Sequence, residues 1–566
     1  MPVHDEVFEA FRLALAQGRV ADAIALEPRL QAAFAGRADE AQAWFEAGHL
    51  YAEHWRFTDS DRLLTRAASL APGDPSVHSI LASVRHELGD TAGALATLAA
   101  ARREPPDLRI ATSEALMLPQ VYADASDVER WRARYDMGLA TLEAAAPGFD
   151  ASQVMALERG NFLLAYQGRD DLALQRRYSR FIAGLADRAV PQWRAPRPAR
   201  FDGGRRLRVG FVGSLFRDCT AGRYFERWAT GLDPHRFERV VFHTGPVSDT
   251  ASARIAAGVD RFVALRATIR ETAARLAEEA LDVIIYPEVG MDAMTYVLAA
   301  LRLAPLQCAG WGHPVTTGSD AIDAFITAAP MEPPEAAAHY SEELVALPGL
   351  GVDYPLPPVP EGVSRAAFGL PGDRRIYACP QSLFKIHPDM DGLFADLMEG
   401  DPSGVLVFFQ ATARAVTEAF ARRLQRTLAA RGIPPRGQLK FLPRMPGRDF
   451  RAFLASSDVV VDTVHWSGGN TSLDALAAAT PVVTTRGRFM RGRQTAAMLG
   501  AMGLEGLVAA DLPAAARTAI EVATQPELRH EISQAIIERR GAIFSRPEPV
   551  AALGEALLRL TAGKGG

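Results

Sequence analysis

Two sets of short, β-branched apolar runs follow residue 206, and each run alternates with a stretch of helical periodicity. The first set is RLRVGFVGS, RVVFHTG, LDVIIYPEVG, LQCAGWGHP, AIDAFIT and LVALPG. The second set, after the proline-rich segment PLPPVPEGVS, is RIYACPQ, VLVFFQA, LKFLPRM, DVVVDT and TPVVTTRG. Strands that alternate with helices build parallel sheets from βαβ units. We therefore expect an α/β fold with two Rossmann-like halves, residues 207–360 and 361–566, facing across a cleft.

The chain before residue 190 has a different pattern, rich in Ala, Leu and Arg, with apolar residues at helical spacing. Residues typical of a tetratricopeptide repeat occur in two successive segments, and the Ala and Pro near the end of each are 34 residues apart, which is the period of that repeat. They are Trp44, Gly48, Tyr51, Ala67 and Pro72, then Leu81, Ala94, Leu98, Ala101 and Pro106. We expect residues 1–190 to form an all-α tetratricopeptide-like domain, joined to the first half by a linker at 191–206. A plain helical bundle is the alternative.

The bulk composition excludes several classes of protein. A formal net charge of −5 and a pI near 6.2 argue against a nucleic-acid-binding protein. The three cysteines, Cys219, Cys308 and Cys379, are too far apart for a CxxC pair, which fits a reducing compartment. The N-terminus lacks the pattern of a signal peptide, and no apolar run approaches the ~18 residues of a membrane span. We expect a soluble, cytoplasmic protein with no membrane partner.

The segment DTVHWSGGNTSLDAL contains the most informative loop. Two glycines permit a tight turn, and the polar residues after them begin a helix, where free amides and the helix dipole attract phosphate. The residues concerned are Gly468, Gly469, Asn470, Thr471 and Ser472. Asp474 falls in the first turn, where a carboxylate can bind a ribose. A structural helix cap is the alternative, and three nearby arginines favour the anion site: Arg488, Arg491 and Arg493.

A second loop, ACPQSLFKIHPDM, presents Lys385 after a strand. A cation there would stabilise the charge that develops when a nucleoside diphosphate departs. In the first half, the loops after strands offer titratable side chains. They are Asp218, Cys219, Glu288, Asp292 and His313.

Motifs for other chemistries are absent from the sequence. It has no HExxH and no P-loop, no GxSxG elbow, and no GxGxxG after the first strand. We therefore predict neither a bound metal nor a cofactor, and we expect any nucleotide sugar to be a substrate.

Taken together, these segments resemble the bacterial SPINDLY-like branch of the protein O-GlcNAc transferase family over nearly the whole chain. The matching motifs, in order, are RVGFVGS, YPEVGMD, LRLAPLQCAGWGHPVTTG, YSEELVALPG, LFKIHP, SGGNTSLDALA and TPVVTTRGRFMRGR. The resemblance implies a GT-B fold, a metal-independent reaction and a sugar nucleotide bound mainly by the C-terminal half. It also relates the chain to flagellin glycosyltransferases.

The resemblance also implies roles for individual residues. Lys385 contacts the diphosphate and helps the leaving group, and Asp474 binds the ribose. Thr471 and Ser472 lie at the phosphate-binding helix start, with Gly468, Gly469 and Asn470 in the same donor loop. The remaining positions are Gln381 beside the diphosphate, the backbone around Arg444 and Met445 at the base, and Gly312, His313 and Pro314 on the sugar side.

Three departures from the family pattern leave the donor and the catalytic base open. Better-known members have a histidine where this chain has Cys219, another where it has Gly469, and a tyrosine where it has His313. The donor is accordingly UDP-GlcNAc, another UDP-hexose, or a CMP-linked nonulosonic acid. As general base we rank His313 first because its ordinary pKa lies near the working pH. Asp218 follows, and then Glu288.

The function that these residues favour is transfer of a sugar to a Ser or Thr hydroxyl of a protein held on the repeats, flagellin being one candidate acceptor. The hydroxyl would displace the nucleotide in line. Two other classes remain: a repeat scaffold with a degenerate transferase domain, and a nucleotide-sugar epimerase, in which the repeats would have no role.

Overall fold

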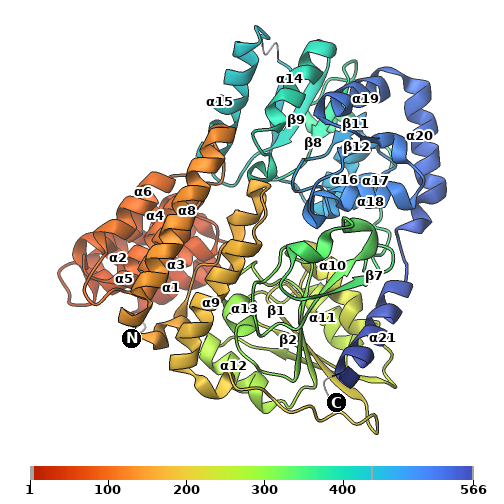
Figure 1. The fold of residues 1–566 in the computed structure, drawn as a ribbon. Coiled ribbons are helices and arrows are strands. Elements are labelled where there is room, and N and C mark those ends of the chain that lie inside the picture. The colour runs from red at the N-terminus through yellow and green to blue at the C-terminus, as the bar shows by residue number, and fades with distance from the viewer. Residues whose placement is uncertain (1–4, 435–436, 564–566) are drawn as a thin grey trace. The chain divides into compact units, whose positions relative to one another are not determined.

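A computed structural model describes residues 5–434 and 437–563, which divide into two compact units (Figure 1). One unit holds residues 5–120, 131–153 and 411–419. The other holds the remaining described residues. No described helix has the length and apolar character needed to cross a membrane.

The first unit consists of helices that pack in consecutive pairs. They are α1 (Glu6–Ala16), α2 (Val20–Phe34), α3 (Glu40–Glu53), α4 (Phe57–Leu70), α5 (Pro75–Glu87), α6 (Thr91–Ala100), α7 (Leu108–Leu116) and α8 (Ala125–Ala145). The pairs α1 with α2, α3 with α4 and α5 with α6 are in close contact. A Cβ at Gly48 would lie 2.8 Å from Leu64 Cγ, so a small residue is needed where α3 meets α4. The predicted helical repeat region is confirmed.

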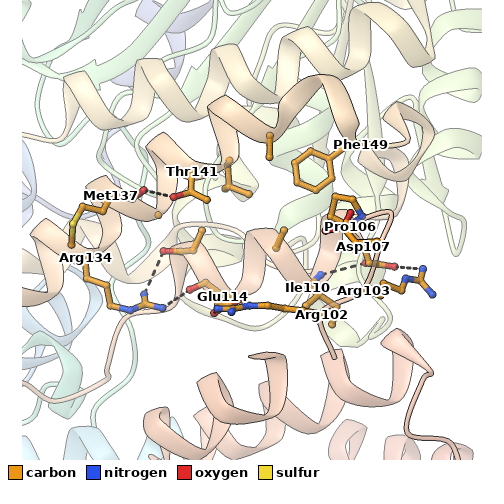
Figure 2. A pocket seen from close by; sticks show the side chains of 16 residues that line it. Arg102, Arg103, Pro106, Asp107, Ile110, Glu114, Arg134, Met137, Thr141 and Phe149 are labelled. Carbon is orange, nitrogen blue, oxygen red and sulfur yellow. Dashed lines mark hydrogen bonds and ion pairs between the residues drawn. The ribbon is translucent and has the colours of Figure 1, made fainter. Parts of the chain in front are cut away.

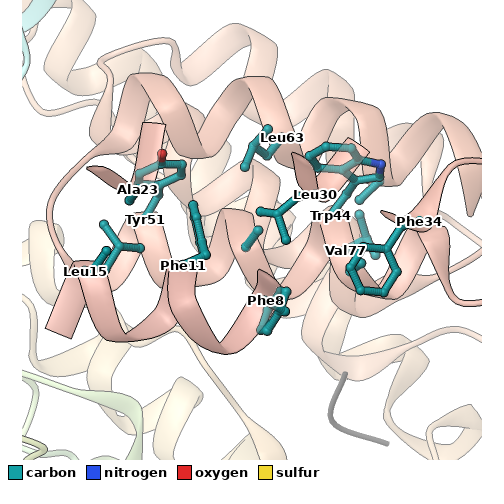
Figure 3. Packing of buried hydrophobic residues seen from close by; sticks show 14 residues of the cluster. Phe8, Phe11, Leu15, Ala23, Leu30, Phe34, Trp44, Tyr51, Leu63 and Val77 are labelled. Atoms are coloured by element: carbon teal, nitrogen blue, oxygen red, sulfur yellow. The ribbon is translucent and has the colours of Figure 1, made fainter. Parts of the chain in front are cut away.

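A continuous apolar core joins α1 to α5 (Figure 3). Phe11 and Tyr51 are fully buried and meet edge to face at 5.2 Å, while Trp44 is 4% exposed. Aspartates begin four of the helices, because the side chains of Asp5, Asp74, Asp90 and Asp107 accept hydrogen bonds from first-turn amides. Each helix pair therefore buries its apolar stripe on its neighbours, as stacked repeats require.

The second unit contains two sheets in which every strand pairing is parallel. The first has the order β3-β2-β1-β4-β5-β6-β7. Its strands are β1 (Leu207–Gly213), β2 (Phe237–His243), β3 (Arg261–Ala264), β4 (Val283–Tyr286), β5 (Leu306–Gly310), β6 (Ala324–Ala328) and β7 (Glu343–Leu347). Sequence analysis found all of these except β3, an edge strand whose two ends are exposed.

The second sheet repeats this winding with the order β10-β9-β8-β11-β12-β13. Its strands are β8 (Ile376–Cys379), β9 (Val405–Phe409), β10 (Leu439–Leu442), β11 (Val459–Val461), β12 (Val482–Thr485) and β13 (Val508–Ala509). The two-residue β13 was not predicted. The expectation of two Rossmann-like halves is confirmed.

Helices connect the strands of both sheets. They are α10 (Thr220–Thr230), α11 (Thr250–Gly258), α12 (Ile269–Glu278) and α13 (Ala293–Ala299) in the first half, and α14 (Met390–Gly400), α15 (Arg414–Ala430), α16 (Gly447–Ala455), α17 (Asn470–Ala477) and α18 (Gln494–Ala501) in the second. Two more helices, α19 (Leu512–Thr524) and α20 (Pro526–Arg539), follow the last strand. The strand order reverses between β1 and β4, and again between β8 and β11. Ligands of such sheets bind beyond the carboxyl ends of the strands at these reversal points.

Two helical segments pack against a different part of the fold from the one to which the sequence assigned them. Residues 154–190, which include α9 (Leu172–Ala189), belong to the second unit rather than to the repeats. Buried Arg491 ties them there by donating to Ala165 O and pairing with Asp171 at 2.9 Å. The last helix, α21 (Glu548–Gly563), returns to the first sheet, where it lies against β7 and Glu555 pairs with Arg236.

Candidate active site

The loop after β11 is anchored by the buried carboxylate of Asp462. Its Oδ1 accepts from the Gly468 amide at 2.6 Å and the Thr463 amide at 2.8 Å, and its Oδ2 accepts from the Thr484 hydroxyl at 2.8 Å. These bonds fix the Gly-Gly turn that leads into α17. Asp462 therefore shapes the predicted phosphate loop from beneath.

The start of α17 leaves polar groups without partners. The amides of Asn470 and Thr471 have no hydrogen-bond acceptor among the described residues. The Gln381 side chain donates to Thr471 Oγ1 at 2.6 Å, while its own Oε1 is buried with no donor nearby in the described chain. Ser472, by contrast, is buried and bonded to the Thr495 hydroxyl at 2.8 Å. The two free amides thus suit an anion, whereas the unpaired Gln381 oxygen needs a donor, and Ser472 faces the interior.

Asp474 is buried one turn into α17 within a small polar network. Asn470 Nδ2 donates to Asp474 Oδ2 at 2.9 Å, and Arg451 Nη1 lies 3.5 Å from Oδ1. The hydroxyl of Tyr354, from the segment between the two sheets, donates to Asn470 Oδ1. Burial raises the pKa of Asp474, and the charge of Arg451 opposes that shift. The network holds the carboxylate beside the helix start.

Lys385 ends a short 3-10 turn, Leu383–Lys385, in the loop after β8. Its side chain is partly buried, and Nζ lies 5.7 Å from the centre of the Trp466 ring. Burial lowers the pKa of the ammonium to about 8, against the opposing charge of Asp462. An ammonium that is already partly desolvated and has no ion pair in the described chain is available to an incoming anion.

An aromatic cluster surrounds this lysine. Tyr166 lies 4.2 Å from the Trp466 ring and 4.9 Å from Phe384, and Phe162 stands 5.6 Å from His313, all measured between ring centres. Phe162 and Tyr166 belong to the 3-10 segment Phe162–Gln167, which we had assigned to the repeat domain. The run NFLLAYQ was the available signal, but its partners lie hundreds of residues away in sequence.

His313 is buried in this aromatic cluster, with 1% of its surface exposed. Neither ring nitrogen has a hydrogen-bond partner among the described residues. Burial lowers the pKa of the imidazole to about 3, and the charge of Arg491 adds to the effect. The expectation that His313 titrates near its ordinary pKa is therefore wrong, and the ring is neutral at physiological pH. Beside it, Gly312 donates to Pro287 O at 2.8 Å, and Pro314 is buried.

The other base candidates differ in environment. Glu288 is 2% exposed, and burial, with a smaller effect of the Asp292 charge, raises its pKa to about 8. Asp218 is exposed and forms an ion pair with Arg223 at 3.0 Å. The Cys219 thiol donates to Leu215 O at 3.3 Å, and burial raises its pKa, so it stays protonated. Only Glu288 combines burial with a pKa near the working range.

Gly469 meets a side chain of the first half. A Cβ at this position would lie 2.6 Å from Tyr224 Oη and 2.7 Å from Gln494 Oε1. Tyr224, on α10, thus occupies the space that a side chain at position 469 would need.

The side chains of the three predicted arginines either bond to protein groups or are exposed. Arg491 bonds to Asp171 and to backbone carbonyls, Arg493 donates to Gly487 O, and Arg488 is exposed over the Phe489 ring. Met445 is partly buried and Arg444 exposed in the loop before α16.

One His–Asp–His cluster joins the lysine loop to the Gly-Gly loop. Asp389 Oδ2 lies 2.8 Å from His465 Nε2 and 3.2 Å from His387 Nδ1. Such ligands also suit a transition metal. However, both rings share one carboxylate oxygen, and these contacts hold the pKa of Asp389 well below its usual range. Hydrogen bonding between the rings and the carboxylate accounts for the arrangement, which fixes the two loops together.

Comparison with a solved structure shows which fold the chain has. A mutant O-GlcNAc transferase from Thermobaculum terrenum aligns with 100% of this chain and 99% of its own, with a TM-score of 0.70 and 22% identity. The shared architecture over both lengths, with two parallel sheets whose carboxyl-end loops form the candidate site, shows the GT-B fold, as predicted.

Residues 191–350 and 359–545 match glycosyl transferase family 41, and the chain belongs to that family. A probable UDP-N-acetylglucosamine–peptide N-acetylglucosaminyltransferase SEC of Arabidopsis thaliana is 25% identical over 63% of this chain and 38% of its own length. The SPINDLY protein of Solanum lycopersicum, with the same description, is 29% identical over 40% of this chain and 24% of its own. The chain therefore aligns with less than two fifths of either relative.

Proposed function

We propose that this glycosyltransferase transfers GlcNAc, or another UDP-linked hexose, from its nucleotide to a Ser or Thr hydroxyl of a protein. The observation that carries the proposal is the pair of free amides of Asn470 and Thr471 at the start of α17, together with the Lys385 ammonium in the loop after β8, which has no ion pair among the described residues. The cations and amide donors among them are what a diphosphate needs. The names of the relatives point to UDP-GlcNAc and a peptide acceptor.

In the proposed reaction the acceptor oxygen attacks the anomeric carbon while the bond from that carbon to the distal phosphate oxygen breaks. The electron pair leaves with UDP, and Lys385 and the α17 amides stabilise it. The proton of the hydroxyl passes to a base, for which we now place Glu288 before Asp218 and His313. The reaction as proposed requires no metal, since Lys385 supplies the positive charge, and no cofactor.

A thermal-shift screen across UDP-, GDP- and CMP-sugars tests the donor. Bound ligand stabilises the folded state by a term that grows with its concentration over Kd. We expect UDP-sugars to raise Tm most. A response to the CMP-linked sugar alone would move the donor to a nonulosonic acid, and no response to any of them would favour a non-catalytic scaffold.

The variant Asp474→Asn tests how the nucleotide is held. If the carboxylate binds the ribose, removing its charge weakens UDP and UDP-sugar equally, because the contact exists in both ground and transition states. We expect Kd for UDP, measured by calorimetry, to rise about tenfold, as loss of a charged hydrogen bond predicts, with kcat nearly unchanged. Asp458→Asn, whose carboxylate pairs with Arg365 elsewhere in the sheet, is the control. An unchanged Kd for UDP would make Asp474 a purely structural residue.

For the protein acceptor we propose docking on the repeat unit at an apolar groove between α7 and α8 (Figure 2). The groove has a volume of about 540 Å³, and Ile110, Leu142 and Phe149 form part of its lining. Met137 stands at its edge with 65% of its surface exposed. Exposed methionine beside an apolar floor suits side chains of varied shape, as binding to different peptide sequences requires.

Met137→Glu tests this surface. A charge at the groove edge should raise KM for the protein acceptor several-fold and leave Kd for UDP unaltered, with Met137→Leu as the control of equal size. Since Met137 is exposed, neither change should lower Tm by much. Equal acceptor KM for both variants and the wild type would place the docking surface elsewhere.

A further inference from the structure

The hydroxyl of Tyr224 is a buried polar group without a partner. The side chain is 4% exposed, and Oη has no hydrogen-bond partner among the described residues. A buried hydroxyl in this condition costs free energy unless something pairs with it. A ligand that accepts a hydrogen bond from this hydroxyl in the active enzyme would remove that free-energy cost.

The position of Tyr224 shows where such a group would be. Its ring packs against Trp311 at 4.8 Å and Tyr354 at 5.4 Å, so the hydroxyl is held by neighbours from the first half and the inter-sheet segment. Its Oη comes so close to Gly469 that a Cβ there would lie only 2.6 Å away. Gly469 is the residue before α17, next to the unpaired amides of Asn470 and Thr471.

Burial keeps this phenol neutral. It raises the pKa of Tyr224 well above its ordinary value, and the charge of Asp474 adds to the shift. A neutral phenol can donate its O–H to a phosphate oxygen, and a charged acceptor of this kind makes the stronger hydrogen bond.

We propose that Tyr224 donates a hydrogen bond to the sugar-side phosphate of the nucleotide diphosphate, so that α10 of the first half completes the site built by α17. This inference rests on the proposed function for the ligand's class, but it assigns a contact from the opposite half of the fold. Glycine is then required at position 469 for a second reason besides the tight turn, because any side chain there would displace the Tyr224 hydroxyl.

The test compares Tyr224→Phe with the wild type by calorimetry, using UDP and UMP as ligands. Loss of one hydrogen bond to a charged phosphate should raise Kd for UDP about tenfold or more. Kd for UMP, which lacks the sugar-side phosphate, should stay within about twofold of the wild-type value. Gly469→Ala, which must push Oη away, should show the same selective loss.

Stability measurements separate this contact from a structural role. Removing an unpaired buried hydroxyl is neutral or stabilising, so the ligand-free Tyr224→Phe protein should melt at or above the wild-type Tm. Tyr377→Phe is the matched control: its buried hydroxyl donates to Asp401 at 2.8 Å, and its loss should lower Tm without changing either Kd.

Three results would overturn the inference. Equal losses for UDP and UMP would mean that Tyr224 acts through the nucleoside or the fold. If the wild type binds UDP and Tyr224→Phe leaves Kd for UDP and for UMP unchanged, Tyr224 does not contact the phosphate, and the proposed function is unaffected. A wild type that binds neither UDP nor inorganic pyrophosphate would end both.

Discussion

Lys385→Ala should reduce kcat for sugar transfer by about 10²–10³-fold, as removal of a preorganised charge at a leaving group generally does. The fold should be preserved, because Nζ has no ion pair among the described residues that the change would break. Single-turnover transfer from the donor, with circular dichroism and Tm as checks, measures the effect. Near-normal turnover by a folded variant would remove Lys385 from the mechanism.

The lowered pKa of Lys385 gives this prediction a pH signature. The ammonium loses its proton as the pH rises through about 8, so the free enzyme loses its leaving-group cation on the alkaline side. Since kcat/KM reports the free enzyme, it should fall above that pH. A bound diphosphate raises the pKa of a neighbouring ammonium, so kcat should hold to higher pH.

Lys385→Arg is the matched control. A guanidinium keeps its charge throughout the range, although its flat shape will not reproduce the ammonium contact. We expect lower activity but no alkaline fall in kcat/KM. If the arginine variant keeps the wild-type alkaline limb, another group is responsible for it.

The residues show which parts of this site a sequence can and cannot predict. Lys385 and the Gly468–Asp474 loop could be located, because loops after parallel strands meet at one edge of a sheet. The repeats could be located by period, and Gly48 has the close packing that its offset implied. These features depend on local spacing, which the sequence carries directly.

The features that sequence analysis missed depend on contacts between distant segments. Burial of His313 against Phe162 and Trp466 sets its pKa, and no local pattern around WGHP reveals those partners. Residues 154–190 look like one more helical stretch until Arg491 and Trp466 are seen to hold them beside the lysine loop. Tyr224 gave no signal, because an aromatic residue on a helix is most often core.

Glu288→Gln should lower kcat by about 10²–10⁴-fold, the range for loss of a general base. Glutamine has the same shape, and it can still accept from the Leu215 amide as Glu288 Oε1 does at 3.3 Å. The reaction needs the ionised carboxylate, so wild-type kcat/KM should rise with pH through about 8. Deprotonation of Lys385 lowers kcat/KM on the alkaline side. The pH profile of wild-type kcat/KM should therefore be a narrow bell centred near pH 8. Lys385→Arg should retain only the rising limb.

The pH dependence of protein stability tests the raised pKa of Glu288 independently of activity. In the folded chain the pKa of Glu288 is raised from 4.5 to about 8, so the unfolded state loses its proton first as the pH rises. The stability that the buried neutral acid contributes is present in full below pH 4.5 and is lost as the pH rises to about 8. Glu288→Gln cannot ionise, so its Tm should exceed that of the wild type at pH 8 and match it at pH 4.5.

A variant that is more stable yet less active is the expected sign of a strained catalytic group. Asp292→Asn supplies the control, because the Asp292 charge contributes to the raised pKa of Glu288. Its removal should lower that pKa and move the rising limb of kcat/KM to lower pH, without abolishing transfer.

If Glu288→Gln gains stability at pH 8 but keeps full activity and an unaltered pH profile, Glu288 is a buried acid and not the base. Asp218→Asn and His313→Gln, assayed in the same way, would then decide between the remaining two, and full activity in both would leave the proton to water or to the donor phosphate.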